Sequence, residues 1–408
     1  MMECIWGKSD NKIICWCGRM KGFKFAGIHA GIKDNGKKDL GLIYCEEPAV
    51  AAALFTRNKV IAAPVIIEKE KIKSGLCQAV LVNSGNANCF TGQKGIEDAK
   101  ACSKKLSHTL GIADDLVFVS STGVIGANLP MEKFTKGIPE ITGSISQNSV
   151  DDFANAILTT DTHSKIVKLS GEISDKKFSI MGIAKGSGMI RPDMATMLAF
   201  VCTDVKISAK NLKTALKEAN KKSFNRITID GDTSTNDTLL ALANTTSMIE
   251  INSVESKKIF QDILDQVCFE LASMVVKDGE GATKLVKIIV KGAKTKHDAF
   301  KTCETIAHSN LVKTAIYGED PNWGRITAAA GRSGADVDPE KMDLFFDDQA
   351  LVLNGKWLGV GAEQKTALIM KKKEIKITLD LNLGQESDFF LFCDFSQDYV
   401  KINAEYRS

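Results

Sequence analysis

The stretch 185–198 constrains the fold of this chain more than any other. It stands between two apolar runs, 177–184 and 198–203, whose residue types are typical of β-strands. A hairpin needs only a few residues to join two strands, but this connection also contains two glycines, which permit positive φ, and a proline, which fixes its own φ. The stretch therefore predicts a rigid loop that presents a side chain, and we expect that side chain to be Thr196.

Composition places the chain among ordinary globular proteins. Its 408 residues are enough for two or three domains with sizeable cores. Hydrophobic residues make up 44% and charged residues 25%, and the net charge is only +3, which argues against a dedicated binder of nucleic acids or membrane surfaces. Aromatic residues make up 7%, too few to suggest a stacking platform for single-stranded nucleic acids.

The 11 cysteines show no repeated spacing, and the first residues carry charges where a secretory signal would carry an apolar segment. Free thiols and a cytoplasmic location are therefore expected. Cys15 and Cys17 lack the second pair that a zinc site would need, so no metal is predicted. No apolar run reaches the roughly 18 residues of a membrane helix. The role of residues 1–20 is left open.

Hydrophobic patterns predict an α/β fold with a larger domain at 1–284 and a smaller one at 285–408. In the larger domain, strands are expected at 49–55, 60–69, 77–82 and 117–120, and turns at 56–58 and 83–88. Helices are expected at 95–110, 149–158, 208–219 and 253–277, the last three opened by capping serines. In the second, the pattern predicts a strand at 284–290, a helix at 299–311, a loop at 322–324, a helix ending near 331 and short strands up to 395.

Thr196 can act as a nucleophile only if a base stands beside it, because a threonine hydroxyl is weak by itself. The 5 histidines lie at scattered positions, and composition alone favours an ordinary β-branched residue entering a strand. Cleavage of the bond between Ala195 and Thr196 would supply the base, since it frees an α-amino group on the same residue. Such a group titrates near pH 7.7–8.0, which suits it to accept the hydroxyl proton.

Four other positions suit an acyl-transfer site, although each also has a plainer explanation. Thr122 and Gly123 follow an expected strand and open a turn, so a hydroxyl and a backbone N–H could point into one cleft. Glu280 stands between two glycines after a helix end, which is a poor place for a core residue. Lys185 follows a strand, where most lysines are simply solvated.

Two further patterns indicate little chemistry. The stretch 230–236 has the oxygen spacing with which a calcium-binding EF-hand begins, but Thr235 replaces the required glycine and Ala241 the bidentate glutamate. A polar turn that supports the site is the better explanation. The glycine-rich stretch 185–188 lacks the rest of a P-loop, so it is only a weak indication of nucleotide binding.

Several long motifs occur in one order along the chain, at 31–34, 55–58, 83–88, 121–126, 231–237, 317–324 and 402–408. With these and with 185–198, the chain from about Gly22 to Ser408 resembles the ornithine acetyltransferase family, the glutamate N-acetyltransferases of arginine biosynthesis. The resemblance implies a layered sandwich of sheets flanked by helices, similar in outline to N-terminal-nucleophile enzymes, with a smaller C-terminal α/β domain completing the site.

The resemblance also implies the reaction. Thr196, freed by self-cleavage, would take the acetyl group from N2-acetylornithine, release ornithine and pass the group to glutamate in a ping-pong sequence. It implies no metal and no organic cofactor, and it leaves open whether acetyl-CoA also serves as a donor, as a bifunctional N-acetylglutamate synthase would need. The fragments, of 195 and 213 residues, are expected to stay together as a heterotetramer with two copies of each.

Residue roles follow by matching positions to the family's motifs. Thr122 and Gly123 match the oxyanion hole, and the substrate-contacting positions are matched by Thr159, Lys185, Thr196, Glu280, Asn403 and Ser408. Lys185 would meet an amino-acid carboxylate, and Glu280 the side-chain ammonium of ornithine. Glutamate must use the same pocket, and two carboxylates are unfavourable next to each other in the absence of water. We therefore expect this end of the pocket to be solvated, with positive charge or amide donors within reach of Glu280.

Two alternatives stay open. An N-terminal-nucleophile amidase or aminopeptidase would share the freed threonine but pass the acyl group to water. A non-enzymatic structural module would keep its chain uncut.

Overall fold

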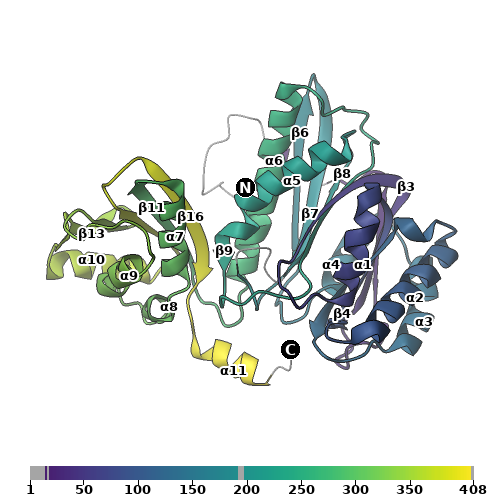
Figure 1. The fold of residues 1–408 in the computed structure, drawn as a ribbon, viewed down its shortest axis with the longest axis horizontal. Coiled ribbons are helices and arrows are strands. Elements are labelled where there is room, and N and C mark those ends of the chain that lie inside the picture. Colours follow the sequence, from purple (N-terminus) through teal and green to yellow (C-terminus); the bar gives the residue numbers. More distant parts are fainter. Residues whose placement is uncertain (1–13, 16–17, 192–196, 406–408) are drawn as a thin grey trace.

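The computed structural model describes residues 14–15, 18–191 and 197–405. Their strands form two sheets, each flanked by helices, which confirms the predicted α/β class. Figure 1 shows the larger sheet on the right and the smaller one on the left, with the C-terminal helix α11 (Gln397–Glu405) below them. No helix in these ranges is long and apolar enough to cross a membrane.

The larger sheet has nine described strands, in the order β1-β6-β7-β8-β10-β3-β4-β5, with β2 paired to β3. Their bounds are Ile14–Cys15 (β1), Phe23–Ile28 (β2), Leu40–Phe55 (β3), Leu76–Asn86 (β4), Val117–Val124 (β5), Lys165–Ile173 (β6), Lys176–Lys185 (β7), Leu198–Thr203 (β8) and Thr238–Ala243 (β10). Most neighbours are antiparallel, but β8 and β10 run parallel, as do β4 and β5. The sheet is therefore mixed rather than doubly wound.

Helices cover both faces of this sheet. Their bounds are Ala63–Lys71 (α1), Gly92–Leu110 (α2), Met131–Gly143 (α3), Val150–Ala156 (α4), Ala209–Lys221 (α5) and Val254–Lys277 (α6), with short 3-10 turns at Ile72–Ser74, Asp114–Leu116 and Phe224–Arg226. One core cluster joins α5 and α6 to strands β6, β7, β8 and β10, and a second, on the other face, joins α4 to β2, β3, β7 and β8. A third packs α2 and α3 against β4 and β5. In Figure 1, α5 and α6 lie over the strands β6 to β8.

The smaller sheet has seven described strands, in the order β14-β13-β12-β15-β11-β16-β9. The strands are Ile227–Thr228 (β9), Leu285–Ala293 (β11), Asp343–Phe346 (β12), Gln349–Leu353 (β13), Lys356–Trp357 (β14), Glu374–Asp380 (β15) and Glu386–Cys393 (β16), and the helices beside them are Lys296–Ala307 (α7), Asn310–Tyr317 (α8), Trp323–Gly331 (α9) and Val360–Met370 (α10). Because β9 precedes α6 in the chain and pairs with β16, backbone hydrogen bonds connect this sheet to the N-terminal part.

Several local predictions are confirmed. The strands expected at 177–184 and 198–203 are β7 and β8, which lie side by side and antiparallel, so the stretch between them joins neighbouring strands. The helix expected at 253–277 is α6, where Ser253 and Ser256 form the capping box that opens it. Ser208 caps α5, since its side chain accepts a hydrogen bond from the N–H of Asn211.

Other local predictions are wrong. The strand expected at 60–69 is helix α1, because Pro64 suits the first helical turn, where the missing N–H is not needed. The helix expected at 299–311 is two helices, since α7 ends at Ala307 and Ser309 caps α8. Ser149 precedes α4 but its side chain makes no capping bond. The loop expected at 322–324 is the start of α9, and α3, α10 and α11 were not predicted at all.

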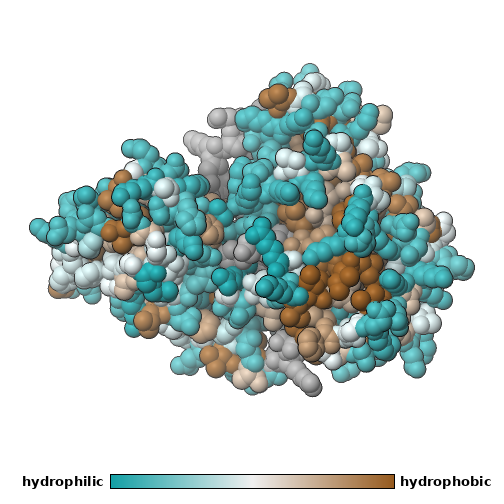
Figure 2. Space-filling view, viewed as in Figure 1, coloured by the Kyte–Doolittle hydropathy of each residue, from teal (hydrophilic) through white to brown (hydrophobic). Residues whose placement is uncertain are grey.

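The face shown in Figure 2 is mostly hydrophilic, with the main apolar area on the larger lobe near α1. Exposed apolar side chains in and beside α1 include Val60 and Ile66, which are 45% and 41% exposed. Scattered apolar residues are ordinary on protein surfaces, so the core clusters rather than this area explain the fold.

We predict that Gly27→Ala destabilises the protein, because β2 passes close to the backbone of α4. A Cβ on Gly27 would stand 2.0 Å from the carbonyl oxygen of Asp152, and only backbone movement could relieve the clash. Overpacking of this kind lowers the free energy of unfolding by about 1–3 kcal/mol. Chemical denaturation measures the change, with Gly143→Ala in α3 as control, since a Cβ there meets nothing within 4 Å. Equal unfolding midpoints for the two variants would contradict the prediction.

Candidate active site

Two glycines face each other where β4 and β5 end, and they shape one wall of the site. Gly123 has φ +132°, and Gly85, its partner across the ladder, has φ +99°. A Cβ on Gly123 would stand 2.4 Å from the carbonyl carbon of Gly85, so a side chain there would clash with backbone. The turn expected after residue 120 is wrong, because β5 continues through Thr122 to Val124. The predicted oxyanion-hole residues therefore stand at a strand end.

Lys185, the last residue of β7, supplies a buried ammonium to the site. Its Nζ donates hydrogen bonds to Thr122 Oγ1 at 3.1 Å and to Thr159 Oγ1 at 3.0 Å. Burial lowers the pKa of Lys185, and the nearby carboxylate of Asp161 acts in the opposite direction. This one side chain links β5 with the segment after α4, although β5 and β7 are not neighbours in the sheet.

Glu280 lies between α6 and β11, and Asn403 lies on α11. Asn403 Nδ2 donates to Glu280 Oε2 at 2.8 Å and to the carbonyl oxygen of Tyr399 at 3.0 Å. The N–H of Glu280 donates to the Ser187 carbonyl at 2.7 Å, and a Cβ on Gly188 would stand 2.4 Å from Glu280 Oε2. The loop after β7 is thus closed against the carboxylate, and an amide donor stands within its reach.

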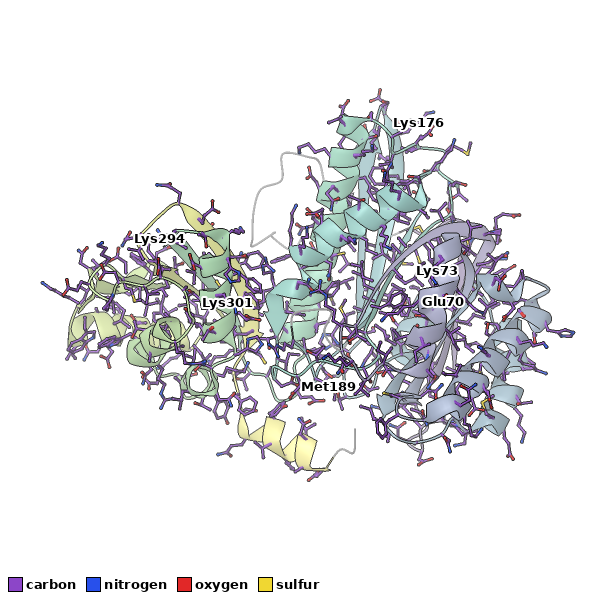
Figure 3. The ribbon with its side chains drawn as sticks, in the orientation of Figure 1. Glu70, Lys73, Lys176, Met189, Lys294 and Lys301 are labelled. Atoms are coloured by element: carbon purple, nitrogen blue, oxygen red, sulfur yellow. The ribbon has the colours of Figure 1, made fainter. Side chains whose placement is uncertain are left out.

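These groups line one open cavity with an empty volume of about 570 Å³, open solvent included. The six predicted residues that meet there are Thr122, Gly123, Thr159, Lys185, Glu280 and Asn403. Met189, Ser234, Thr235 and Asn236 also line the cavity. Figure 3 places Met189 near the middle of the molecule, close to α11. Residues from β5, β7, the segment after α6 and α11 therefore converge, although they lie far apart in the sequence.

Ala195, Thr196 and Ser408 lie outside the described residues. The predictions of a cleavage site, a nucleophile and a last substrate contact at these positions stay predictions. The chain on either side of 192–196 is described, and it is held firmly.

Two aspartates, the half-buried Asp230 and the fully buried Asp237, hold that chain. Asp230 accepts hydrogen bonds from the backbone N–H groups of Met189 and Ile190, the latter at 2.8 Å, and Asp237 Oδ1 accepts one from the N–H of Met197 at 3.0 Å. Burial raises the pKa of Asp230 to about 6 and the pKa of Asp237 well above its usual range. The carboxylate of Asp230, in the stretch with EF-hand-like spacing, thus anchors the chain that follows β7. Within the described ranges, no group of three or more His, Cys, Asp or Glu side chains could hold a metal ion.

Asn236 supports the wall that carries Thr122. Its Nδ2 donates to the carbonyl oxygens of Ala87 at 2.6 Å and Ser121 at 2.8 Å, and its Oδ1 accepts from Thr235 Oγ1 at 2.5 Å. The side chain of Asn236 is buried, so each of these polar atoms needs its partner. The orientation of the peptide before Thr122 is therefore set from the neighbouring loop.

A buried charge cluster, made of Asp161, Lys165 and Asp278, lies behind the cavity. Lys165 Nζ stands 2.7 Å from Asp161 Oδ1 and 2.5 Å from Asp278 Oδ2, and the side chains of all three residues are at most 2% exposed. Burial alone would raise the pKa of Asp161, but the charges of Lys185 and Lys165 and two hydrogen bonds lower it to about 2. The carboxylate of Asp161 is therefore charged at neutral pH, and it pairs directly with the amino group of Lys165.

Sequence reasoning missed this cluster and Asn236. Asp161 and Asp278 stand just after the helices expected at 149–158 and 253–277, and Asn236 stands in the stretch 230–236 that was explained as a supporting turn. Lys165 gave no signal, because a lysine in an alternating strand is normally exposed. Only contacts between distant segments identify these residues.

Comparison with known proteins identifies the family of this chain. The model of the ArgJ family matches residues 24–408. The chain belongs to the ArgJ family. The resemblance stated from the motifs is thereby confirmed, and the chain is an acyltransferase of arginine biosynthesis.

Two relatives show how far the similarity extends. The chain is 46% identical over 391 residues to the arginine biosynthesis bifunctional protein ArgJ of Geobacter sulfurreducens, covering 95% of this chain and 100% of that protein. It is 45% identical over 399 residues to the glutamate N-acetyltransferase of Methanocaldococcus jannaschii, covering 95% of this chain and 97% of that protein. Among solved structures, the chain is similar to ornithine acetyltransferase complexed with ornithine from Mycobacterium tuberculosis, with 35% sequence identity and a TM-score of 0.41. That match covers 44% of this chain and 98% of the other.

We predict that Asn236→Asp lowers the free energy of unfolding by about 2–4 kcal/mol at pH 7. The change replaces a donor by a charged acceptor that faces two carbonyl oxygens, and each buried group left without its partner costs about 1–3 kcal/mol. Denaturation at pH 7 and pH 4 measures the effect, which should shrink at the lower pH because a protonated aspartate can donate again. Asn128→Asp, at an exposed position, is the control. A loss that does not exceed the control's would show that Asn236 supports nothing.

Proposed function

We propose that this ArgJ-family chain moves the acetyl group of N2-acetylornithine to glutamate, producing ornithine and N-acetylglutamate. The observation that carries the proposal is the cavity in which Thr122, Gly123, Lys185, Glu280 and Asn403 meet. It combines donors for a developing oxyanion, a cation for a carboxylate and an anion for an ammonium. Relatives named glutamate N-acetyltransferase support the same substrates.

Lys185 would bind the α-carboxylate that acetylornithine and glutamate share. An ammonium has three N–H groups, and within the described chain two of them are taken by the hydroxyls of Thr122 and Thr159. These partners are neutral, so they orient the charge without cancelling it. An ion pair made at this buried position is screened little by water.

Glu280 and Asn403 would bind the far end of the substrate. The carboxylate of Glu280 suits the side-chain ammonium of ornithine. Asn403 is exposed, so water reaches this end, and its amide can turn towards the side-chain carboxylate of glutamate. One pocket would then accept a cation in the first half-reaction and an anion in the second.

Thr196 would act twice. In self-cleavage its hydroxyl attacks the carbonyl carbon of Ala195, the C–N bond breaks, and water hydrolyses the resulting ester, which leaves a carboxylate on Ala195 and a free amino group on Thr196. In turnover that amino group accepts the hydroxyl proton, the oxygen attacks the acetyl carbonyl, and the proton passes to the departing amine of ornithine. The amine of glutamate then attacks the acetyl ester and restores the hydroxyl.

Thr122 and Gly123 would stabilise the negative oxygen in each of these steps. Thr122 Oγ1 already accepts a hydrogen bond from Lys185, so its own proton is free to be donated and is made more acidic by the neighbouring charge. The N–H of Gly123 is held in place by the close contact with Gly85.

The remaining parts of the proposal concern the whole assembly. The reaction needs no metal or organic cofactor, acetyl-CoA could serve as a second acetyl donor, and two copies of each fragment would form a heterotetramer. The eight described free cysteines are all buried thiols, which fits the reducing conditions of the cytoplasm.

Intact mass spectrometry tests the central step. We expect fragments of 195 and 213 residues, and an acetyl adduct on the second after incubation with acetylornithine. Thr196→Ala should give one uncut and inactive chain, whereas Thr214→Ala, at an exposed position on α5, should be cut normally. An uncut wild-type chain that transfers acetyl groups would overturn the mechanism. Ornithine release without glutamate would instead identify the amidase.

We predict that Glu280→Gln lowers kcat/KM for acetylornithine by about 10- to 100-fold, because a hydrogen-bonded charge pair is worth about 1.5–3 kcal/mol. The half-reaction with glutamate should change less, since its side chain is itself an anion. Single-turnover measurement of each half-reaction separates the two effects. Glu386→Gln, at an exposed position on β16, is the control. Equal losses in both half-reactions would rule out Glu280 as the partner of the ornithine ammonium.

A further inference from the structure

Asp161 is a buried carboxylate that takes no part in the proposed chemistry, yet it touches two segments of the cavity. Its Oδ2 accepts from the N–H of Thr159 at 3.1 Å. Its Oδ1 accepts from the N–H of Gly186 at 2.7 Å and from Lys165 Nζ at 2.7 Å. The side chain of Thr159 accepts a hydrogen bond from the ammonium of Lys185, and Gly186 is the residue that follows Lys185 in the chain.

We propose that Asp161 is a positioning residue that keeps the ammonium of Lys185 charged and aligned for the carboxylate of the substrate. The inference rests on the proposed function, since it assigns Lys185 to that carboxylate. It adds a specificity-determining residue that does not itself touch the ligand.

The charges around Lys185 support this role. Five charged groups act on Lys185 or interact with it. Asp161 lies just before β6, and Lys165 is the first residue of β6. The other three are Glu280 after α6, Asp237 before β10 and Lys33 before β3. Of these, Asp161 is the carboxylate that most favours the charged form of Lys185, and Lys165 acts against it. Burial raises the pKa of Asp237, and its effect on Lys185 is smaller than that of Asp161 or Glu280. Loss of Asp161 would therefore leave Lys185 with the opposing cation of Lys165 and without the carboxylate that most favours its charged form.

The contacts of Asp161 also fix geometry. Thr159 Oγ1 can accept from Lys185 only if the backbone of its segment is held, and Asp161 Oδ2 bonds the N–H of Thr159 itself. Thr160 Oγ1 and Ser187 Oγ lie 2.7 Å apart, which adds a second link between the same two segments. A small movement of either segment would change the direction of the Lys185 ammonium.

Asp278 offers a matched comparison. It is the other carboxylate of Lys165, with its own bonds to the N–H of Thr162, and it is also buried. It makes no hydrogen bond in the described chain to Thr159 or Gly186. Asp278→Asn thus removes a carboxylate from the same cluster but leaves the hydrogen bonds of Asp161 to Thr159 and Gly186 in place.

Ornithine binding, measured by calorimetry at pH 6.5 and pH 8.5 and compared with wild type at each pH, tests the proposal without an acetyl-transfer step. For Asp161→Asn we expect at least a tenfold weaker binding than wild type at pH 8.5 and a much smaller loss at pH 6.5, because the lower pH restores the ammonium of Lys185. Asp278→Asn should show losses that differ little between the two pH values. Asp161→Glu, which keeps the charge but shifts the carboxylate, should keep the wild-type pH dependence and bind more weakly at both.

Each outcome decides the matter. Losses of equal size at both pH values for Asp161→Asn would show that Asp161 is merely structural, and wild-type binding by Asp161→Glu would remove its positioning role. If Asp161→Asn does not fold, as judged by circular dichroism, Asp161→Glu alone still decides whether the carboxylate must stand where it does. A wild-type protein that binds no ornithine would contradict the proposed function itself, and the inference that rests on it would fall for that separate reason.

Discussion

The ion pairs of Lys165 with Asp161 and Asp278 hold together the parts of the chain that carry the substrate-binding groups. All three side chains are at most 2% exposed, and removal of one partner from such a cluster typically costs about 3–5 kcal/mol, because a buried charge is left without its counter-ion. Asp161 is bonded to the backbone beside Lys185, and Asp278 ends α6, two residues before Glu280. The separation of the Lys185 cation and the Glu280 carboxylate, which sets the length of ligand that can span them, therefore depends on this cluster.

The opposite wall is held by neutral groups. Asn236 bonds the carbonyl oxygens of Ala87 and Ser121, and the contact of Gly85 with Gly123 leaves no room for a side chain. The two walls thus differ chemically: the wall held by the ion pairs positions the charged groups of Lys185 and Glu280, and the opposite wall positions uncharged hydrogen-bond donors. An oxyanion that exists only in the transition state is well served by fixed neutral dipoles, which bind it strongly only once its charge develops.

Sequence patterns predicted β7, β8 and α6 because each has its signal within a few residues: an apolar run, or a capping serine followed by an apolar period. They failed at α1, where a run of apolar residues around Pro64 resembles a strand. Six site residues were predicted by matching motifs to a family, and the cavity brings them together. Lys165 could not be predicted, because its burial depends on Asp278, which is 113 positions away in the chain. Local patterns carry no information about such pairs.

The raised pKa of Asp237 has a consequence for the proposed base. An amino group accepts a proton only while it is uncharged, and a neighbouring carboxylate would raise its pKa and keep it protonated. Asp237 accepts a hydrogen bond from the N–H of Met197, the residue after the proposed nucleophile, and burial raises the pKa of this carboxyl, which disfavours its negative charge. The ammonium of Lys185 lies near enough to interact with Asp237, and a nearby cation lowers the pKa of an amine. A carboxyl whose charge is disfavoured by burial and a nearby cation would thus both favour the free amine, which is the form that an amino-terminal threonine needs to activate its own hydroxyl at neutral pH.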